Sequence, residues 1–357
     1  MKKLFSLVLA LALLSTAAYA TGYEAIYSSD NPIPAIVRAV RPAVVEVISI
    51  QQDWSVETGI VDRDVGSGSG VYVDDAGYII TNNHVIDDAD KVKVILWDDT
   101  ELDAEIVGCD EGIDIAVIKI EPQPDITPVP MGDSDQIEVG ELAIAIGNPG
   151  TQSSATLKGS VTAGIISAVG REEMGAGVFT RPVALIQTDA AINTGNSGGA
   201  LLNARGELIG IPMLKYIADA AAVYESLGFA IPINTIKPVY EQLVATGKMV
   251  RPMLGVTVVD NAGPYEPLKR YSPAGAKVYT VSPGTSAERS GILPNDIITH
   301  VNGVRVSVVN DLLREIDKHA VGDVLELTVC RFYDSVTGEA LDDYETLTFS
   351  VELAIIN

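Results

Sequence analysis

Thr188–Leu202 reads TDAAINTGNSGGALL, a polar, glycine-rich bend between the apolar runs 184–187 and 200–202. Glycines lie on both sides of its single serine, Ser197, so the backbone there can adopt conformations that other residues rarely reach. Such a loop can present a hydroxyl and aim several backbone N–H groups at one point, which are the two requirements of acyl transfer. An ordinary tight turn uses the same residue types, so the catalytic interpretation depends on partners elsewhere in the chain.

A nucleophilic serine needs a base, and histidine is the side chain whose ordinary pKa suits this task. The chain has 3 histidines, and His84 is the only one before the domain boundary that we predict near 248–251. It follows the apolar run 78–81, in an expected loop from which its side chain can enter a cleft. The alternative is a histidine on a surface loop. No histidine has a second His or Cys at ligand spacing, so we expect no metal site and no cofactor.

A third group must orient the imidazole and stabilise its cation, and two aspartates could do so. Asp114 directly precedes the apolar run 115–118, which would place it at the mouth of a core and partly shielded. Asp110 lies in the polar bend 109–112, where we expect it to be solvated. We therefore predict Asp114 as the third member. The order along the chain is then histidine, aspartate, serine.

Short apolar runs separated by Gly, Asp and Pro predict a mainly β protein of antiparallel barrels or sandwiches. The expected strands are 44–50, 71–73, 78–81, 91–97, 102–107, 114–120, 141–146, 161–168, 184–188, 200–203 and 207–211, and the expected helices are 33–40 and 235–245. The segment 121–130 has four prolines and would connect two similar halves. The polar segment 51–65 is expected to be a loop, followed by a glycine-rich strand edge at 66–70.

Four sequence blocks in this order resemble the signature blocks of the HtrA (Deg) serine proteases. They are TNNHV at 81–85, DIAVI at 114–118, QTDAAIN continuing through GNSGG at 187–199, and GFAIP at 228–232. The resemblance extends from about Pro34 to the C-terminus. It implies a chymotrypsin-like double β-barrel, and we assign the protease domain to residues 35–247.

The resemblance also implies a role for each matching residue. Ser197 would be the nucleophile, His84 the general base and acid, and Asp114 the orienting carboxylate. The oxyanion would lie against the backbone N–H groups of Gly195 and Ser197, with Asn196 between them. Removal of one such donor typically costs about 3 kcal/mol of transition-state stabilisation.

By the same resemblance, four residues would line the primary specificity pocket. These are Ile192, Met213, Leu214 and Lys215. The pocket would be apolar apart from the lysine, so we expect cleavage after small aliphatic residues such as Val or Ala. Pro212 and the acidic insertion 216–225 depart from the family pattern. The segment 170–182 is a candidate for a loop whose ordering controls activity, although a plain surface loop would have the same composition.

Residues 251–357 resemble a PDZ domain of the HtrA type. The matching blocks are RPMLGV at 251–256, SPGTSA at 282–287 and SGILPNDII at 290–298. Such domains bind a peptide as an added strand and hold its C-terminal carboxylate on backbone N–H groups. We assign this loop to Met253, Leu254, Gly255 and Val256. The alternative is that Leu254 and Val256 are core residues of the first strand. A helix at 309–318 would flank the groove.

The 357-residue chain has a formal net charge of −24, which argues against a nucleic-acid partner. We expect residues 1–20 to form a signal peptide, because Lys2 and Lys3 precede an apolar run and Ala18 and Ala20 match a cleavage site. We expect an exported, periplasmic or cell-envelope protein without a stable membrane span. An uncleaved anchor is the alternative.

These observations predict an ATP-independent serine endopeptidase of envelope protein quality control. Its expected partners are unfolded or misfolded protein substrates and the C-terminal peptides that the PDZ domain would bind. Family members are commonly homotrimers, and Tyr23 and Tyr27 in the N-terminal arm 21–34 could contribute to such contacts. The alternative is a chaperone or peptide-sensing scaffold in which proteolysis is minor.

Overall fold

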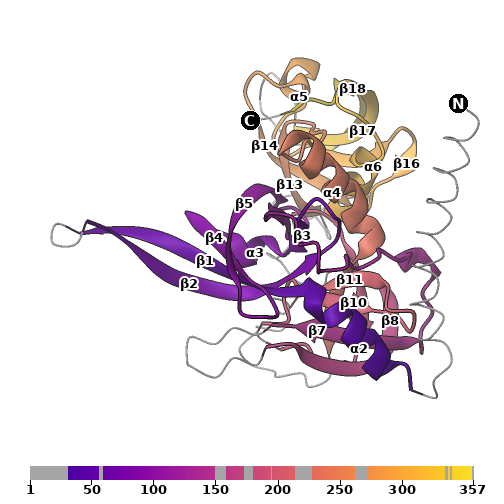
Figure 1. Cartoon of the computed structure of the whole chain (residues 1–357). Coiled ribbons are helices and arrows are strands. Elements are labelled where there is room, and N and C mark those ends of the chain that lie inside the picture. Colours follow the sequence, from indigo (N-terminus) through magenta and orange to yellow (C-terminus); the bar gives the residue numbers. More distant parts are fainter. Residues whose placement is uncertain are drawn as a thin grey trace, which may run out of the picture. The chain divides into compact units, whose positions relative to one another are not determined.

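The computed structural model of the chain describes residues 31–55, 59–148, 158–172, 180–193, 195–213, 227–261, 272–333, 337 and 340–355. The chain divides into two compact units between Met249 and Val250 (Figure 1). Strands are the main secondary structure of both units, which confirms the mainly β class. The segment 1–20 expected to be a signal peptide, most of the N-terminal arm and its two tyrosines lie outside the described residues.

Six antiparallel strands close the first barrel of the first unit. In their order around the barrel they are β1 (Val44–Ser55), β2 (Gly59–Tyr72), β3 (Tyr78–Thr81), β6 (Ile115–Lys119), β5 (Glu101–Asp110) and β4 (Lys91–Ile95). Their β-branched residues suit a pleated, buried surface, and Val47 and Ile79 are fully buried inside. The turn between β2 and β3 forms a hairpin, in which Gly77 N–H donates to Asp74 O.

A second closed barrel follows the proline-rich connection. Its order is β10 (Ala200–Leu202), β11 (Leu208–Met213), β12 (Gly228–Pro232), β9 (Ala184–Thr188), β8 (Ser160–Glu172) and β7 (Leu142–Gly147). Two six-stranded barrels in sequence confirm the predicted chymotrypsin-like architecture. The strand β12 was identified in the sequence only as part of a family block.

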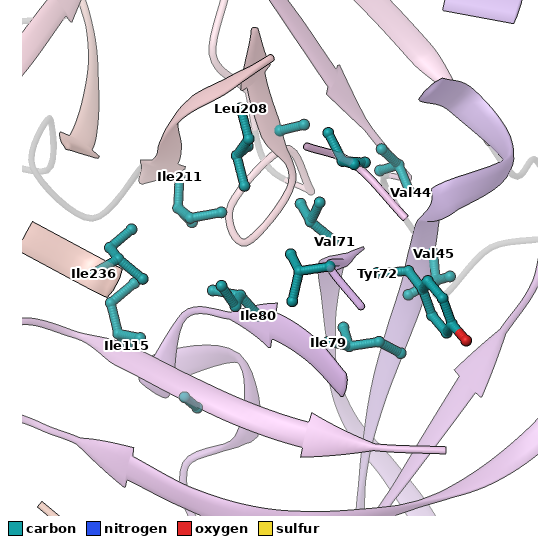
Figure 2. Packing of buried hydrophobic residues seen from close by; sticks show 14 of the residues in the cluster. Val44, Val45, Val71, Tyr72, Ile79, Ile80, Ile115, Leu208, Ile211 and Ile236 are labelled. Atoms are coloured by element: carbon teal, nitrogen blue, oxygen red, sulfur yellow. The ribbon is translucent and has the colours of Figure 1, made fainter. Parts of the chain in front are cut away.

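One hydrophobic cluster spans both barrels. Figure 2 shows Leu208 and Ile211 of β11 beside Val71 and Ile80 of the first barrel, all of them fully buried. The described helices of this unit are α2 (Ile33–Val40), η1 (Arg41–Ala43), α3 (Asn83–Ile86), η2 (Ser134–Gln136) and α4 (Ile233–Thr246). Helix α4 includes the whole expected helix 235–245 and ends with Gly247 as its C-cap, and its Ile236 packs on the same cluster.

The prediction of a polar loop over 51–65 was wrong. The strands β1 and β2 form a long hairpin there, paired from Gln51 with Arg63 to Ser55 with Gly59, and it projects from the barrel (Figure 1). Polar contacts cross the hairpin, such as that between Arg63 Nε and Asp53 Oδ2 at 2.7 Å. A ribbon that exposes both faces has no apolar alternation, so its sequence resembles a loop. The glycine-rich stretch 66–70 also lies within β2.

The second unit contains a sheet in the order β13 (Val256–Asn261), β14 (Gly275–Val281), β15 (Ile297–Val301), β17 (Val324–Tyr333) and β18 (Ala340–Glu352), with β16 (Val304–Arg305) paired to β15. Its helices are α5 (Ser286–Ser290) and α6 (Val309–Ile316). Leu312 of α6 packs against the core of the sheet with Val278 and Leu327. In the part of the chain that the structure describes, no helix is long and apolar enough to cross a bilayer.

Candidate active site

His84 and Asp114 form a directly bonded pair on the first barrel. The His84 Nδ1 and Asp114 Oδ2 atoms are 2.7 Å apart, and His84 N–H donates to Asp114 Oδ1 at 2.9 Å. A buried carboxylate can only accept, so the Nδ1 atom carries the proton and Nε2 is left as the acceptor. This is the tautomer in which an imidazole can take a proton from a serine hydroxyl.

The backbone around this pair explains its geometry. Asp114 has a positive φ of 56°, and its carbonyl accepts from Asn83 N–H at 3.2 Å and from Asn82 Nδ2 at 2.9 Å. Asp is among the residues that tolerate this left-handed conformation. His84 was expected in a loop, but it lies in the short helix α3. The helix brings its side chain and its N–H to the same carboxylate.

The environment of Asp110 differs from the sequence-based expectation. We expected it to be solvated, but it is only 4% exposed, as is Asp114. Its Oδ1 accepts from Gly112 N–H at 2.9 Å, so it caps its own turn while Asp114 bonds the imidazole. Burial therefore does not distinguish the two aspartates. The direction of their hydrogen bonds does.

The serine loop, residues 195–199 around Ser197, is a bend held by backbone hydrogen bonds. Asn196 N–H donates to Asn193 O at 3.0 Å, and Gly198 N–H donates to Pro212 O at 3.2 Å. Gly198 has a φ of 80°, and a Cβ atom placed on it would lie 2.1 Å from Ser69 O. Only glycine fits this position, because both the conformation and the close approach exclude a side chain.

The helix that carries His84 and the loop that carries Ser197 approach each other at Gly68 of β2. A Cβ atom there would lie 2.7 Å from a methyl group of Val85, the residue after His84, and 3.2 Å from Ser197 O. The histidine helix and the serine loop thus pack against the same glycine. The structure brings the three predicted residues to one junction between the barrels.

Two buried residues at this junction were missed in the sequence. Ser69 N–H donates to Ser197 O at 2.9 Å, and Asn148 N–H donates to Ser69 Oγ at 2.7 Å. The sequence around Ser69 indicated only a strand edge. The alternation of serine with glycine was the available signal, because glycines mark sites where another backbone approaches closely.

The structure does not group the predicted specificity residues. Ile192 packs with Ala190 in the cluster inside the second barrel, whereas Met213 belongs to the cluster that spans both barrels. Leu214 and Lys215 lie outside the described residues. Of the segment 170–182, only 170–172 and 180–182 are described.

Part of the predicted carboxylate-binding loop of the second unit already forms backbone hydrogen bonds within the domain. Met253 exchanges two backbone hydrogen bonds with Ala354, both 3.0 Å long, so its N–H is engaged. Leu254 is buried in the core, in line with the alternative interpretation, and Val256 begins the edge strand β13. Gly255 has a φ of 89° and its carbonyl accepts from Ser282 N–H at 2.9 Å.

Comparison with known proteins adds to this geometry. The family model of a trypsin-like peptidase domain matches residues 68–211, and that of a PDZ domain matches 252–353. HhoA of Synechocystis is 43% identical over 279 residues, covering 75% of this chain and 68% of its own length. The periplasmic serine endoprotease DegP of Escherichia coli is 41% identical over 266 residues, covering 74% of this chain and only 54% of DegP.

The fold has the same relatives among solved structures. A structure of the HtrA-type protease AlgW with a decapeptide matches with a TM-score of 0.72 and 31% sequence identity, covering 90% of this chain and 98% of AlgW. The chain therefore belongs to the HtrA family of trypsin-like serine proteases and has one PDZ domain.

Proposed function

We propose that this serine protease is an ATP-independent endopeptidase that cleaves unfolded or misfolded proteins in the cell envelope. The contact between His84 Nδ1 and Asp114 Oδ2, beside the serine loop at Gly68, carries the proposal. The similarity to DegP, a periplasmic serine endoprotease, supports the location. The proposal includes removal of residues 1–20 as a signal peptide and a homotrimer with contacts from the arm 21–34.

In the proposed mechanism, Ser197 Oγ attacks the scissile carbonyl while its proton moves to His84 Nε2. The Asp114 carboxylate stabilises the imidazolium that forms. The oxyanion lies against the N–H groups of Gly195 and Ser197. His84 then gives the proton to the leaving amine, and water hydrolyses the acyl-enzyme with the same base.

The proposed substrate preference is for small aliphatic residues, such as Val or Ala, before the cleaved bond. The apolar character of Ile192, which precedes the serine loop in the sequence, supports it, and Met213, Leu214 and Lys215 are the other residues proposed for the pocket. Cleavage of a peptide library gives a direct test. A profile dominated by Arg or aromatic residues at this position would contradict the proposal.

We propose that the PDZ domain binds C-terminal peptides along β13, the strand at the edge of its sheet. The carboxylate would bind to N–H groups of Leu254, Gly255 and Val256, because that of Met253 is engaged. Asp260 Oδ1 accepts from Val309 N–H at 2.6 Å, so β13 and α6 are joined at the other end. The similar protease AlgW has been solved with a decapeptide, which supports peptide binding by this chain.

Digestion of unfolded casein by residues 21–357 tests the endopeptidase, with Ser197→Ala as the matched variant. We expect kcat to fall by about 10⁶-fold in the variant, since loss of the nucleophile removes the acyl-enzyme route. A hydrophobic C-terminal peptide should change the rate of the unmodified chain. Equal inertness of both chains with and without peptide would contradict the proposal. Aggregation suppression by Ser197→Ala would then favour a chaperone.

A further inference from the structure

Ser69 is a fully buried serine of β2 whose polar atoms all have partners. Its N–H donates to Ser197 O at 2.9 Å, and its hydroxyl donates to Gly195 O at 2.5 Å. The same hydroxyl oxygen accepts from Asn148 N–H at 2.7 Å. Its carbonyl accepts from the Thr81 hydroxyl at 2.7 Å. One residue thus joins the serine loop to Thr81 of β3 and to Asn148, which follows β7 of the second barrel.

The direction of the hydroxyl bond is fixed by its second partner. A serine hydroxyl has one proton, and Asn148 N–H can only donate to the oxygen. The proton of Ser69 is therefore left for Gly195 O. Asn148 is itself held, because its Nδ2 donates to Val44 O at 2.6 Å and its Oδ1 accepts from Gly159 N–H.

These bonds fix three successive carbonyls of the serine loop. Ser69 holds those of Gly195 and Ser197, and Gly199 N–H donates to Asn196 O at 2.9 Å. Each carbonyl shares a rigid peptide plane with the next N–H group. The N–H of Ser197 lies on the plane whose carbonyl is that of Asn196, so it cannot turn unless these bonds break.

We propose that Ser69 is a positioning residue for the oxyanion-binding groups of this protease. Its hydroxyl, oriented by Asn148, holds Gly195 O while its N–H holds Ser197 O, and the two bonds together keep the intervening N–H group of Ser197 in place. The inference rests on the proposed function, which assigns the oxyanion to these groups. Ser69 itself touches neither the substrate nor the reacting atoms.

This role predicts a particular kinetic signature. Donors that stabilise the oxyanion act in the transition state more than in the bound substrate, so their misplacement lowers kcat and leaves KM nearly unchanged. We expect Ser69→Ala to lower kcat by roughly 10- to 100-fold, less than the 10²- to 10³-fold typical of the loss of a donor itself. Affinity for a peptide aldehyde ending in valine should fall by a similar factor.

The matched control is Ser134→Ala. Ser134 is also a buried serine whose hydroxyl accepts from a backbone N–H, that of Asn234 at 3.0 Å, but it lies in η2 away from the loop. Both variants leave a buried N–H group without its partner and should lose stability. Only Ser69→Ala should lose kcat. Ser69→Cys, which has a similar shape and a weak donor, should be intermediate.

The experiment measures kcat and KM on fluorescent casein, aldehyde inhibition and thermal stability for residues 21–357 and these three variants, with Ser197→Ala beside them. A kcat loss confined to the Ser69 variants, with KM within about threefold and matched loss of aldehyde affinity, supports the inference. Ser69→Ala with full kcat and reduced stability overturns it, as does a change in KM alone. If the unmodified chain shows no cleavage dependent on Ser197, the proposed function itself fails and the inference fails with it.

Discussion

The two barrels hold their parts of the candidate site in different ways. On the first barrel, His84 and Asp114 are 30 residues apart and bond each other directly. On the second barrel, the serine loop is held by Ser69, which is 126 residues away from Gly195 in the sequence. The first half is built from neighbouring strands of one barrel, whereas the second half depends on a strand of the other. A sequence pattern indicates a site built from neighbouring strands of one barrel more readily than a loop held by a strand of the other barrel.

Substitution of the two buried aspartates is the strongest test of how the first barrel holds its part of the site. We expect Asp114→Asn to lower kcat by about 10⁴-fold, because an amide supports the wrong tautomer of the imidazole. The asparagine should keep the fold, since it also tolerates a positive φ. Casein digestion and thermal unfolding measure the two effects.

Asp110→Asn is the control for that variant. Asp110 is equally buried, but its Oδ1 accepts from Gly112 N–H, and an amide oxygen can accept the same bond. We expect kcat within about twofold and a loss of stability near 1 kcal/mol. Similar kcat losses in both variants would show that burial, and not the bond to His84, makes Asp114 important.

Substitutions of Gly198 and Gly140 test how tightly the serine loop of the second barrel is held. We expect Gly198→Ala to lose activity and to destabilise the protein by more than about 2 kcal/mol, because the methyl group would meet Ser69 O. Gly140 has a similar φ of 97° with no atom within 4 Å of its Cβ position. Gly140→Ala should therefore cost only the conformational strain of about 1 kcal/mol and leave kcat unchanged. Chemical denaturation of both variants gives the difference, and equal costs would show that the contact with Ser69 is loose.

The smallest effect is expected on the outer part of β2, the strand that carries Ser69. Arg63 pairs with Asp53, and both side chains are more than half exposed. Because solvent screens such a pair, we expect Arg63→Ala to change the free energy of unfolding by less than about 0.5 kcal/mol. Casein digestion should be unchanged. A clear loss of activity would show that the projecting hairpin takes part in substrate handling.

Sequence reasoning succeeded where local chemistry was sufficient. Asp114 precedes an apolar strand, and this placement identified the aspartate that bonds His84. Gly247 ended α4 because it takes a left-handed conformation there. Short apolar runs separated by Gly, Asp and Pro indicated most strands of both barrels. For the site and the fold alike, the blocks that resemble the HtrA family made the assignment specific.

The failures have physical reasons as well. The hairpin at 51–65 is exposed on both faces, and its apolar residues, such as Trp54, Ile60 and Val61, do not alternate regularly with polar ones. The strand β11 was expected to end before Pro212, but it continues to Met213. The pairing of β11 with β10 ends at Gly210, so the N–H group that Pro212 lacks is not needed for it. The carbonyl of Pro212 accepts a hydrogen bond from Gly198 N–H. Asp110 was expected in solvent because it lies in a polar bend. The sequence pattern does not show that its carboxylate caps this bend by accepting from Gly112 N–H. Ser69 was missed because all its partners are distant in the sequence.

The long separation between Ser69 and its partners has a consequence for the order of folding. A chain made from its N-terminus completes the strands of the first barrel by Lys119, before Asn148 and Gly195 have been synthesised. Contacts between such distant residues form late, because closing a long loop costs entropy that local pairing does not. The bonds that set the serine loop are therefore among the last to form. A nascent chain then acquires the geometry for peptide cleavage only when both barrels are complete, which protects its own unfolded segments from early attack.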